Sequence, residues 1–136
     1  MWPLFALFAM VCFSGMQLLF KHFTRLGMTP AGILVFVFGF GWMLYLVHVV
    51  VGGTAVSRNP GVLGLLFAAG CLGYVGNLCA VRAVGLAPNP GYAVAIFGIQ
   101  ALVVTLVSAL WLGGSVSWLN LLGVLLCFAG VALITT

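Results

Sequence analysis

Three side-chain amides lie inside long apolar stretches of this sequence, and they are the groups best suited to bind a ligand. Gln17, Asn77 and Gln100 each stand among aliphatic and aromatic neighbours. An amide in hydrocarbon needs hydrogen-bond partners, so each should point at another helix or at a path open to water. Two interpretations stay open: hydrogen bonds between helices, or a shared polar cavity.

Aromatic residues accompany two of these amides at helical spacing. Tyr74 precedes Asn77 by three residues, and Phe97 stands at the same distance before the amide of its own stretch. Residues three apart share one face of a helix. A ring beside an amide suits a small amphiphilic or zwitterionic solute, although the spacing is also typical of ordinary packing. We therefore predict a substrate-binding site made of Gln17, Tyr74, Asn77, Phe97 and Gln100.

Catalytic and metal chemistry has little support in this chain. Aspartate and glutamate are absent from all 136 residues, which excludes carboxylate acid/base pairs, carboxylate metal sites and a proton site on a membrane-buried acid of this chain. The cysteines form no CxxC pair and have no histidine at ligand spacing, which indicates buried, reduced packing residues. They are Cys12, Cys71, Cys79 and Cys127. We predict no catalytic residue, no metal and no cofactor, and hence no enzyme.

The composition indicates that lipid surrounds most of the chain. Hydrophobic residues make up 65% of it and charged residues 3%, whereas a soluble domain carries about 25% charged residues. Only four formal side-chain charges are present, and a nucleic-acid-binding surface needs several clustered on one face. They are Lys21, Arg25, Arg58 and Arg82. We therefore expect an integral membrane protein that does not bind nucleic acid.

Five apolar segments have the length of membrane spans. Each has the roughly 17–25 residues that a hydrocarbon core requires, and strands are excluded because an open sheet edge cannot satisfy its backbone in lipid. We predict an all-α polytopic fold of one domain over residues 1–136. The first span should be retained, because no basic region precedes it. The spans cover about 3–20, 31–51, 61–81, 90–112 and 117–134.

The segment boundaries carry capping and orientation signals. Asn89 before Pro90 is typical of a helix start, since proline lacks the N–H that the first turn leaves unpaired. Five spans place the termini on opposite sides of the membrane. Lys21, Arg25 and Arg82 then share a side with the C-terminus, and Arg58 lies on the other. The positive-inside rule favours N-out and C-in, but the bias is small enough to allow insertion in both orientations.

Several short motifs in this chain are typical of a known family. They lie at 65–70, 80–88, 93–96, 110–114 and 122–131. The most specific is the last, in which Gly123 precedes Ala129-Gly130-Val131. On these motifs the sequence resembles one EamA-type unit of the drug/metabolite transporter superfamily. It is also distantly similar to the small multidrug resistance transporters, which often have a lysine where Lys21 ends the first span.

The resemblance implies a transporter built from two units. Larger members fuse two five-helix units of opposite topology, with the substrate path between them. A single unit would then need a partner, either a second copy or a related short chain, and the weak charge bias fits an antiparallel pair. The small multidrug resistance relatives carry a glutamate eight residues before the lysine, where this chain has Phe13, and an acid in the turn before the last helix, where it has Gly114. Proton/drug antiport is therefore not implied for this chain alone.

The leading hypothesis is a transporter of the prokaryotic cytoplasmic (inner) membrane. It would move a small metabolite or amphiphile as a homodimer or heterodimer of five-helix units, without a carboxylate proton site of its own. Two alternatives stay open: a non-transporting accessory membrane subunit, or one half of a lipid-flippase-like heterodimer.

Overall fold

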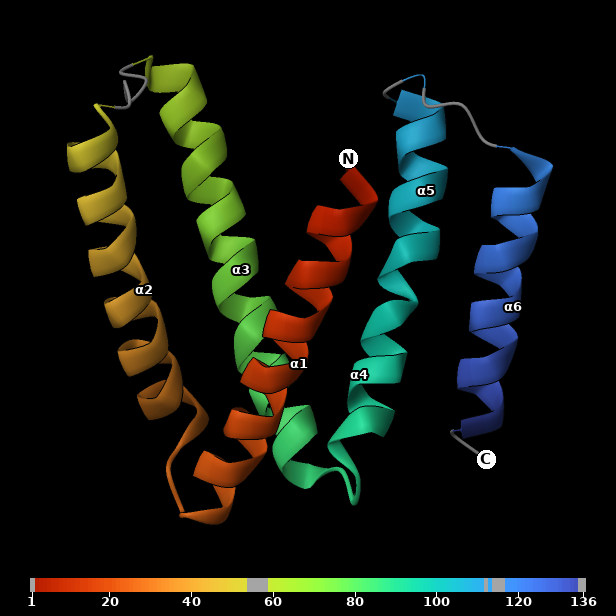
Figure 1. Cartoon of the computed structure of the whole chain (residues 1–136), viewed down its shortest axis with the longest axis horizontal. Coiled ribbons are helices and arrows are strands. Elements are labelled where there is room, and N and C mark those ends of the chain that lie inside the picture. The colour runs from red at the N-terminus through yellow and green to blue at the C-terminus, as the bar shows by residue number, and fades with distance from the viewer. Residues whose placement is uncertain (1, 54–58, 112, 114–116, 135–136) are drawn as a thin grey trace. The chain divides into compact units, whose positions relative to one another are not determined.

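The chain folds into helices throughout the part that the structure describes. This computed structural model describes residues 2–53, 59–111, 113 and 117–134, and no strand occurs among them, so the all-α prediction is confirmed. Four apolar segments are long enough to cross a membrane, and the shorter apolar helix Leu121–Leu133 follows them. The helices in Figure 1 are α1 (Trp2–Arg25), α2 (Pro30–Gly52), α3 (Pro60–Leu86), α4 (Pro90–Gly98), α5 (Gln100–Trp111) and α6 (Trp118–Ile134).

Basic residues that were expected to end two helices lie inside them. The predicted spans stop at about 20 and 81, but α1 continues through Lys21 to Arg25 and α3 continues past Arg82 to Leu86. Long basic side chains do not stop a helix, because their stems stay along the apolar surface while the charged heads reach outward. Cations in the last turn also interact favourably with the carbonyl end of a helix.

The starts of α2, α3 and α4 each combine a capping side chain with a proline at the first helical position. Asn89 accepts a hydrogen bond from the amide of Gly91 at 2.9 Å, which confirms the predicted cap before Pro90. Asn59 does the same for α3 through the amide of Gly61 at 2.9 Å. Thr29 caps α2 by accepting from the amide of Gly32 at 3.2 Å. Side-chain oxygens here satisfy amides that the first turn leaves without helical partners.

The link from α1 to α2 is a compact C-terminal cap. The amide of Gly27 donates to the carbonyl of Thr24 at 3.1 Å, and the amide of Met28 donates to the carbonyl of Phe23 at 3.2 Å. This pair of bonds is the Schellman motif, which requires a left-handed residue after the helix. Gly27 supplies it with φ of 82°. The turn thus reverses the chain within a few residues.

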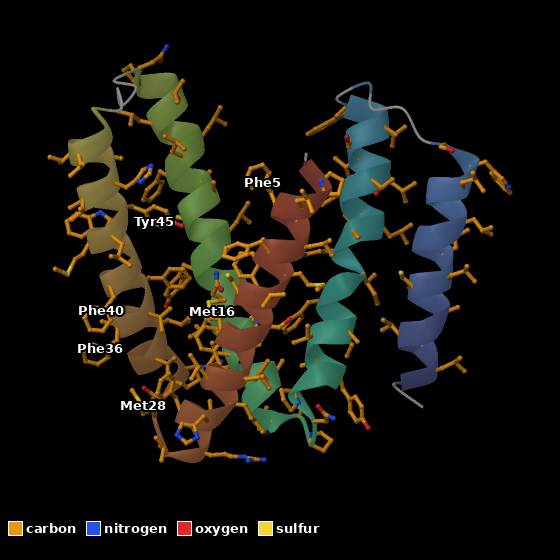
Figure 2. All side chains as sticks on the ribbon, in the orientation of Figure 1. Phe5, Met16, Met28, Phe36, Phe40 and Tyr45 are labelled. Atoms are coloured by element: carbon orange, nitrogen blue, oxygen red, sulfur yellow. The ribbon has the colours of Figure 1, made fainter. Side chains whose placement is uncertain are left out.

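The helices form two compact units that meet in sequence at Gly85 and Leu86. The first unit holds α1, α2 and α3, and α1 contacts α2 within it. The second holds α4, α5 and α6, and α6 packs along both of the others. Most large apolar side chains on the described helices remain exposed, and Figure 2 shows them projecting outward, as Phe36 and Phe40 do from α2. Such a surface suits lipid or another membrane helix rather than water.

The tight packing of the first unit is confined to one end. Phe20 of α1 and Ile33 of α2 are each 1% exposed, and Val81 and Val84 of α3 are 0% exposed. In Figure 1 the C-terminal part of α1 crosses α3 near this end. These four side chains define what we call the packed end. The N-terminal half of α1, by contrast, keeps its large side chains exposed.

Gly85 allows α1 and α3 to approach closely at the packed end. A Cβ atom at Gly85 would lie 3.2 Å from Cγ2 of Thr24. Thr24 has little freedom to withdraw, since its hydroxyl donates to the carbonyl of Lys21 at 2.9 Å. The absence of a side chain at this position is therefore a packing requirement.

Gly85→Val should destabilise the folded protein by about 1–3 kcal/mol, because the added atoms overlap Thr24. Gly64→Val is the matched control, since a Cβ there would meet nothing within 4 Å among the described residues. Both changes place the same residue in α3, so helix propensity cancels. Thermal unfolding in detergent should show a lower Tm for Gly85→Val only. Equal Tm values for the two variants would contradict the close approach.

Candidate functional site

Lys21 joins α1 to the C-terminal turn of α3. Its Nζ donates to the carbonyl oxygen of Gly85 at 2.9 Å, and the side chain is half-buried. Carbonyls in the last turn of a helix lack helical partners and carry the negative end of the helix dipole. At the packed end, the ammonium group therefore gives this carbonyl a hydrogen-bond partner and places a positive charge at the negative end of the helix dipole. Sequence reasoning placed this lysine at the end of a span but did not predict its partner, which is 64 residues away.

Gln17 carries the described polar atom that most needs a partner. The side chain is half-buried on α1, one helical turn before Lys21. Its Oε1 is shielded from solvent, and no hydrogen-bond donor among the described residues reaches it. A buried acceptor without a donor typically costs about 1–3 kcal/mol. One interpretation of Gln17 was a hydrogen bond to another helix. Within the described part of the chain, Oε1 does not make such a bond.

Tyr74 and Asn77 lie on α3 but differ in their surroundings. Tyr74 is 65% exposed and borders a shallow hollow on this helix beside Phe67 and Gly70. Asn77 is half-buried, and its Nδ2 donates to the carbonyl of Gly73 at 2.8 Å, within the same helix. The amide nitrogen of Asn77 thus has a local partner. Its bond does not link α3 to another helix.

Phe97 and Gln100 flank a break in the fourth predicted span. The segment Pro90–Trp111 has the length and hydropathy of one span, yet it consists of α4 and α5 with Ile99 between them. The amide of Ile99 donates to the carbonyl of Ile96 at 3.1 Å, and the amide of Leu102 donates to the carbonyl of Ile99 at 2.9 Å. Both bonds span three residues instead of four, so the helical ladder is interrupted here.

The break was not predicted from the sequence. A signal was present, because Gly98 is followed by the β-branched Ile99, and both residue types are poor helix formers compared with alanine or leucine. Nothing in the residue pattern distinguishes this pair from the many glycines that continue a helix. Phe97 is half-buried before the break and Gln100 is exposed after it.

A cavity of about 400 Å³, half open to the surroundings, lies beside the break. One wall comes from the break and the first turn of α5, including Gly98, Ala101 and Leu102. The facing wall comes from α6, including Gly123, Cys127 and Phe128. All of these residues belong to the second unit. The cavity lies beside the sequence positions of Phe97 and Gln100, but neither of these residues lines it.

The five predicted site residues are divided between the two units. Gln17, Tyr74 and Asn77 belong to the first, and Phe97 and Gln100 belong to the second. Their assembly into one site stays a prediction.

The expectation of buried cysteines is wrong for this chain. All four thiols are free and exposed on helix surfaces. The apolar runs that suggested a core are themselves exposed along most of their length, so residence in such a run does not imply burial in this chain.

Comparison with known families gives one result. The model described as the EamA-like transporter family matches residues 1–136. No curated protein and no solved structure matches the chain.

Gln17→Leu should raise the stability of the folded protein by about 1 kcal/mol or more, because it removes a buried acceptor that has no donor. Gln100→Leu makes the same chemical change at an exposed side chain and should alter stability little. Thermal unfolding of both variants in the same detergent measures the difference. Destabilisation by Gln17→Leu would indicate that its amide has a partner essential to the fold.

Proposed function

This chain belongs to the EamA-like transporter family, and we propose that it moves a small metabolite, an amino-acid-like compound or a lipid-like amphiphile across the membrane by alternating access. The substrate site would use Gln17, Tyr74, Asn77, Phe97 and Gln100. The observation that carries the proposal is the shielded, unpartnered Oε1 of Gln17 in an apolar helix. A substrate N–H or O–H group would supply the donor that the described residues do not.

The missing acids limit how transport is energised. Without aspartate or glutamate, this chain has no carboxylate that could take up and release a proton in the membrane. Transport is then either uncoupled, or coupled through an ion held by neutral groups, or coupled through an acid on a partner chain. Neutral amides suit substrates that present hydrogen-bonding groups rather than a single strong charge.

A second five-helix unit would complete the transporter. Most large apolar side chains of the described helices are exposed, and a Cβ at Gly70, Gly73 or Gly76 would meet nothing within 4 Å among the described residues. Small residues of this kind let membrane helices approach closely. The partner is either another copy of this chain or a related short chain. We place the assembly in the cytoplasmic membrane of a prokaryote.

Asn77→Leu should abolish transport without preventing membrane insertion, because it removes an amide from the proposed site. The measurement is uptake of radiolabelled amino acids, tested one at a time, into proteoliposomes. Wild-type protein should exceed protein-free vesicles for at least one probe, and Asn77→Leu and Gln17→Leu should not. Tyr45→Leu on α2 lies outside the proposed site and should retain transport.

Two results would contradict the proposal. Wild-type rates in Asn77→Leu and Gln17→Leu would overturn the site assignment. No transport of any probe by the wild type, together with purification as a stoichiometric part of an unrelated membrane enzyme, would favour an accessory subunit.

Both termini should be accessible from both sides of the membrane if the unit pairs with an inverted copy of itself. Single cysteines introduced at each end, in a background without native cysteines, can be tested in cells with an impermeant thiol reagent. Labelling of each terminus in two populations supports an antiparallel homodimer. Labelling of each terminus from one side only excludes that arrangement and requires a parallel dimer or a separate partner chain.

A further inference from the structure

The break between α4 and α5 coincides with the 400 Å³ cavity, and the two observations are independent. A membrane span can depart from helical hydrogen bonding only where protein or a cavity accommodates the irregular backbone. Discontinuous helices in transporters are accordingly found at ligand sites. Here the break contributes one wall of a cavity whose volume falls within the range of small-molecule sites.

The walls define the chemistry of the occupant. No lining side chain carries a nitrogen or oxygen atom, so the cavity offers no charge and, apart from the weakly hydrogen-bonding thiol of Cys127, no polar side chain. The small residues Gly98, Ala101 and Gly123 leave space for an occupant. Leu102 and Phe128 supply apolar contact. An ionic ligand would lose its hydration without compensation. The body of the occupant must therefore be alkyl or aromatic.

The stronger polar contact must come from the backbone, and the break provides it. The amide of Leu102 bonds to the carbonyl of Ile99 instead of to that of Gly98, its partner in a regular helix. Gly98 lines the cavity, and its carbonyl oxygen, relieved of that bond, can accept one from an occupant. The occupant should thus carry one small neutral donor, such as a hydroxyl.

Size and position favour a single-chain compound over a phospholipid. At about 30 Å³ for a water-sized group, the cavity holds on the order of a dozen heavy atoms. Gly98 lies eight residues into the span from Pro90, or about 12 Å at 1.5 Å per residue. A phospholipid head group stays at the interface, whereas a small neutral hydroxyl can reach that depth at moderate cost.

We propose that the cavity between the α4–α5 break and α6 binds a single-chain alkyl alcohol or a similar neutral amphiphile. The alkyl chain lies between Leu102 and Phe128, and the hydroxyl donates to a backbone carbonyl at the break. The site lies within the second unit and requires neither the amides of the proposed transport site nor transport itself.

The test uses a photoreactive probe, a decanol that carries a diazirine on its alkyl chain. Wild-type protein in lipid nanodiscs is irradiated with the probe, and labelled peptides are mapped by mass spectrometry. Labels should concentrate in 98–102 and 119–128, and unlabelled decanol should compete with them. A phosphatidylcholine with a diazirine on its acyl chain is the second arm, and it should label the exposed helices evenly.

Gly123→Leu should reduce decanol labelling of these peptides by about tenfold or more, because the new side chain occupies the cavity. Gly130→Leu is the matched control. It makes the same change two turns along the same face of α6, and a Cβ at either glycine would meet nothing within 4 Å among the described residues. Gly98→Leu fills the cavity from the opposite wall. Loss of labelling in this variant as well would show that filling the cavity, and not a change in α6, is the cause.

Each labelling result either supports or overturns the proposed site. Site-specific, competable labelling that Gly123→Leu and Gly98→Leu abolish, and Gly130→Leu preserves, supports the site. Even labelling of all helices, or labelling that Gly123→Leu does not reduce, overturns it. Labelling of the lining peptides by the phospholipid probe, without competition by decanol, overturns the choice of a single-chain occupant. Because the readout is binding, failure of the transport assay does not affect it.

Discussion

Hydrocarbon offers no hydrogen-bond partner, and this constraint underlies the rest of the structure. Every peptide group within a span has to be paired inside its own segment, which leaves the helix as the available form for a single chain. The capping residues follow from the same requirement. Thr29, Asn59 and Asn89 satisfy amides at helix starts, and the Schellman turn at Gly27 does so for carbonyls at a helix end.

A peptide group at a helix end can also be paired by a residue distant in sequence, and such a bond joins two helices. Lys21 satisfies a carbonyl in the last turn of α3, and the close approach of Thr24 to Gly85 accompanies this bond. The buried side chains of the first unit lie around the same place. A charge-assisted hydrogen bond is stronger in apolar surroundings than in water. The packed end therefore combines the strongest polar contact of the unit with its densest apolar contact.

In the described part of the chain, two places depart from full pairing, and both are candidate sites. At Gln17 a side-chain oxygen is shielded without a donor. At Ile99 the backbone ladder shifts from four-residue to three-residue spacing beside a cavity. The first provides polarity in an apolar helix, and the second provides apolar space next to polar backbone. A transporter of amphiphilic compounds needs both kinds of contact, because its substrates combine both kinds of surface.

The sequence by itself determined the medium and the fold class, since the absence of acids and the length of the apolar runs leave only a helical membrane protein. It also predicted local features that depend on neighbouring residues, such as the Asn89 cap and the placement of Tyr74 and Asn77 on one helix. Only the structure decided that Lys21 bonds to Gly85, that no described donor reaches Oε1 of Gln17, that the cysteines are exposed and that the fourth span breaks at Ile99. The break is local, but its Gly98-Ile99 pair resembles many that continue a helix. For the other three features the physical reason is distance along the chain. Capping acts within a few residues, whereas burial and interhelical bonds depend on which distant faces meet, and exposed apolar runs look the same in sequence as buried ones.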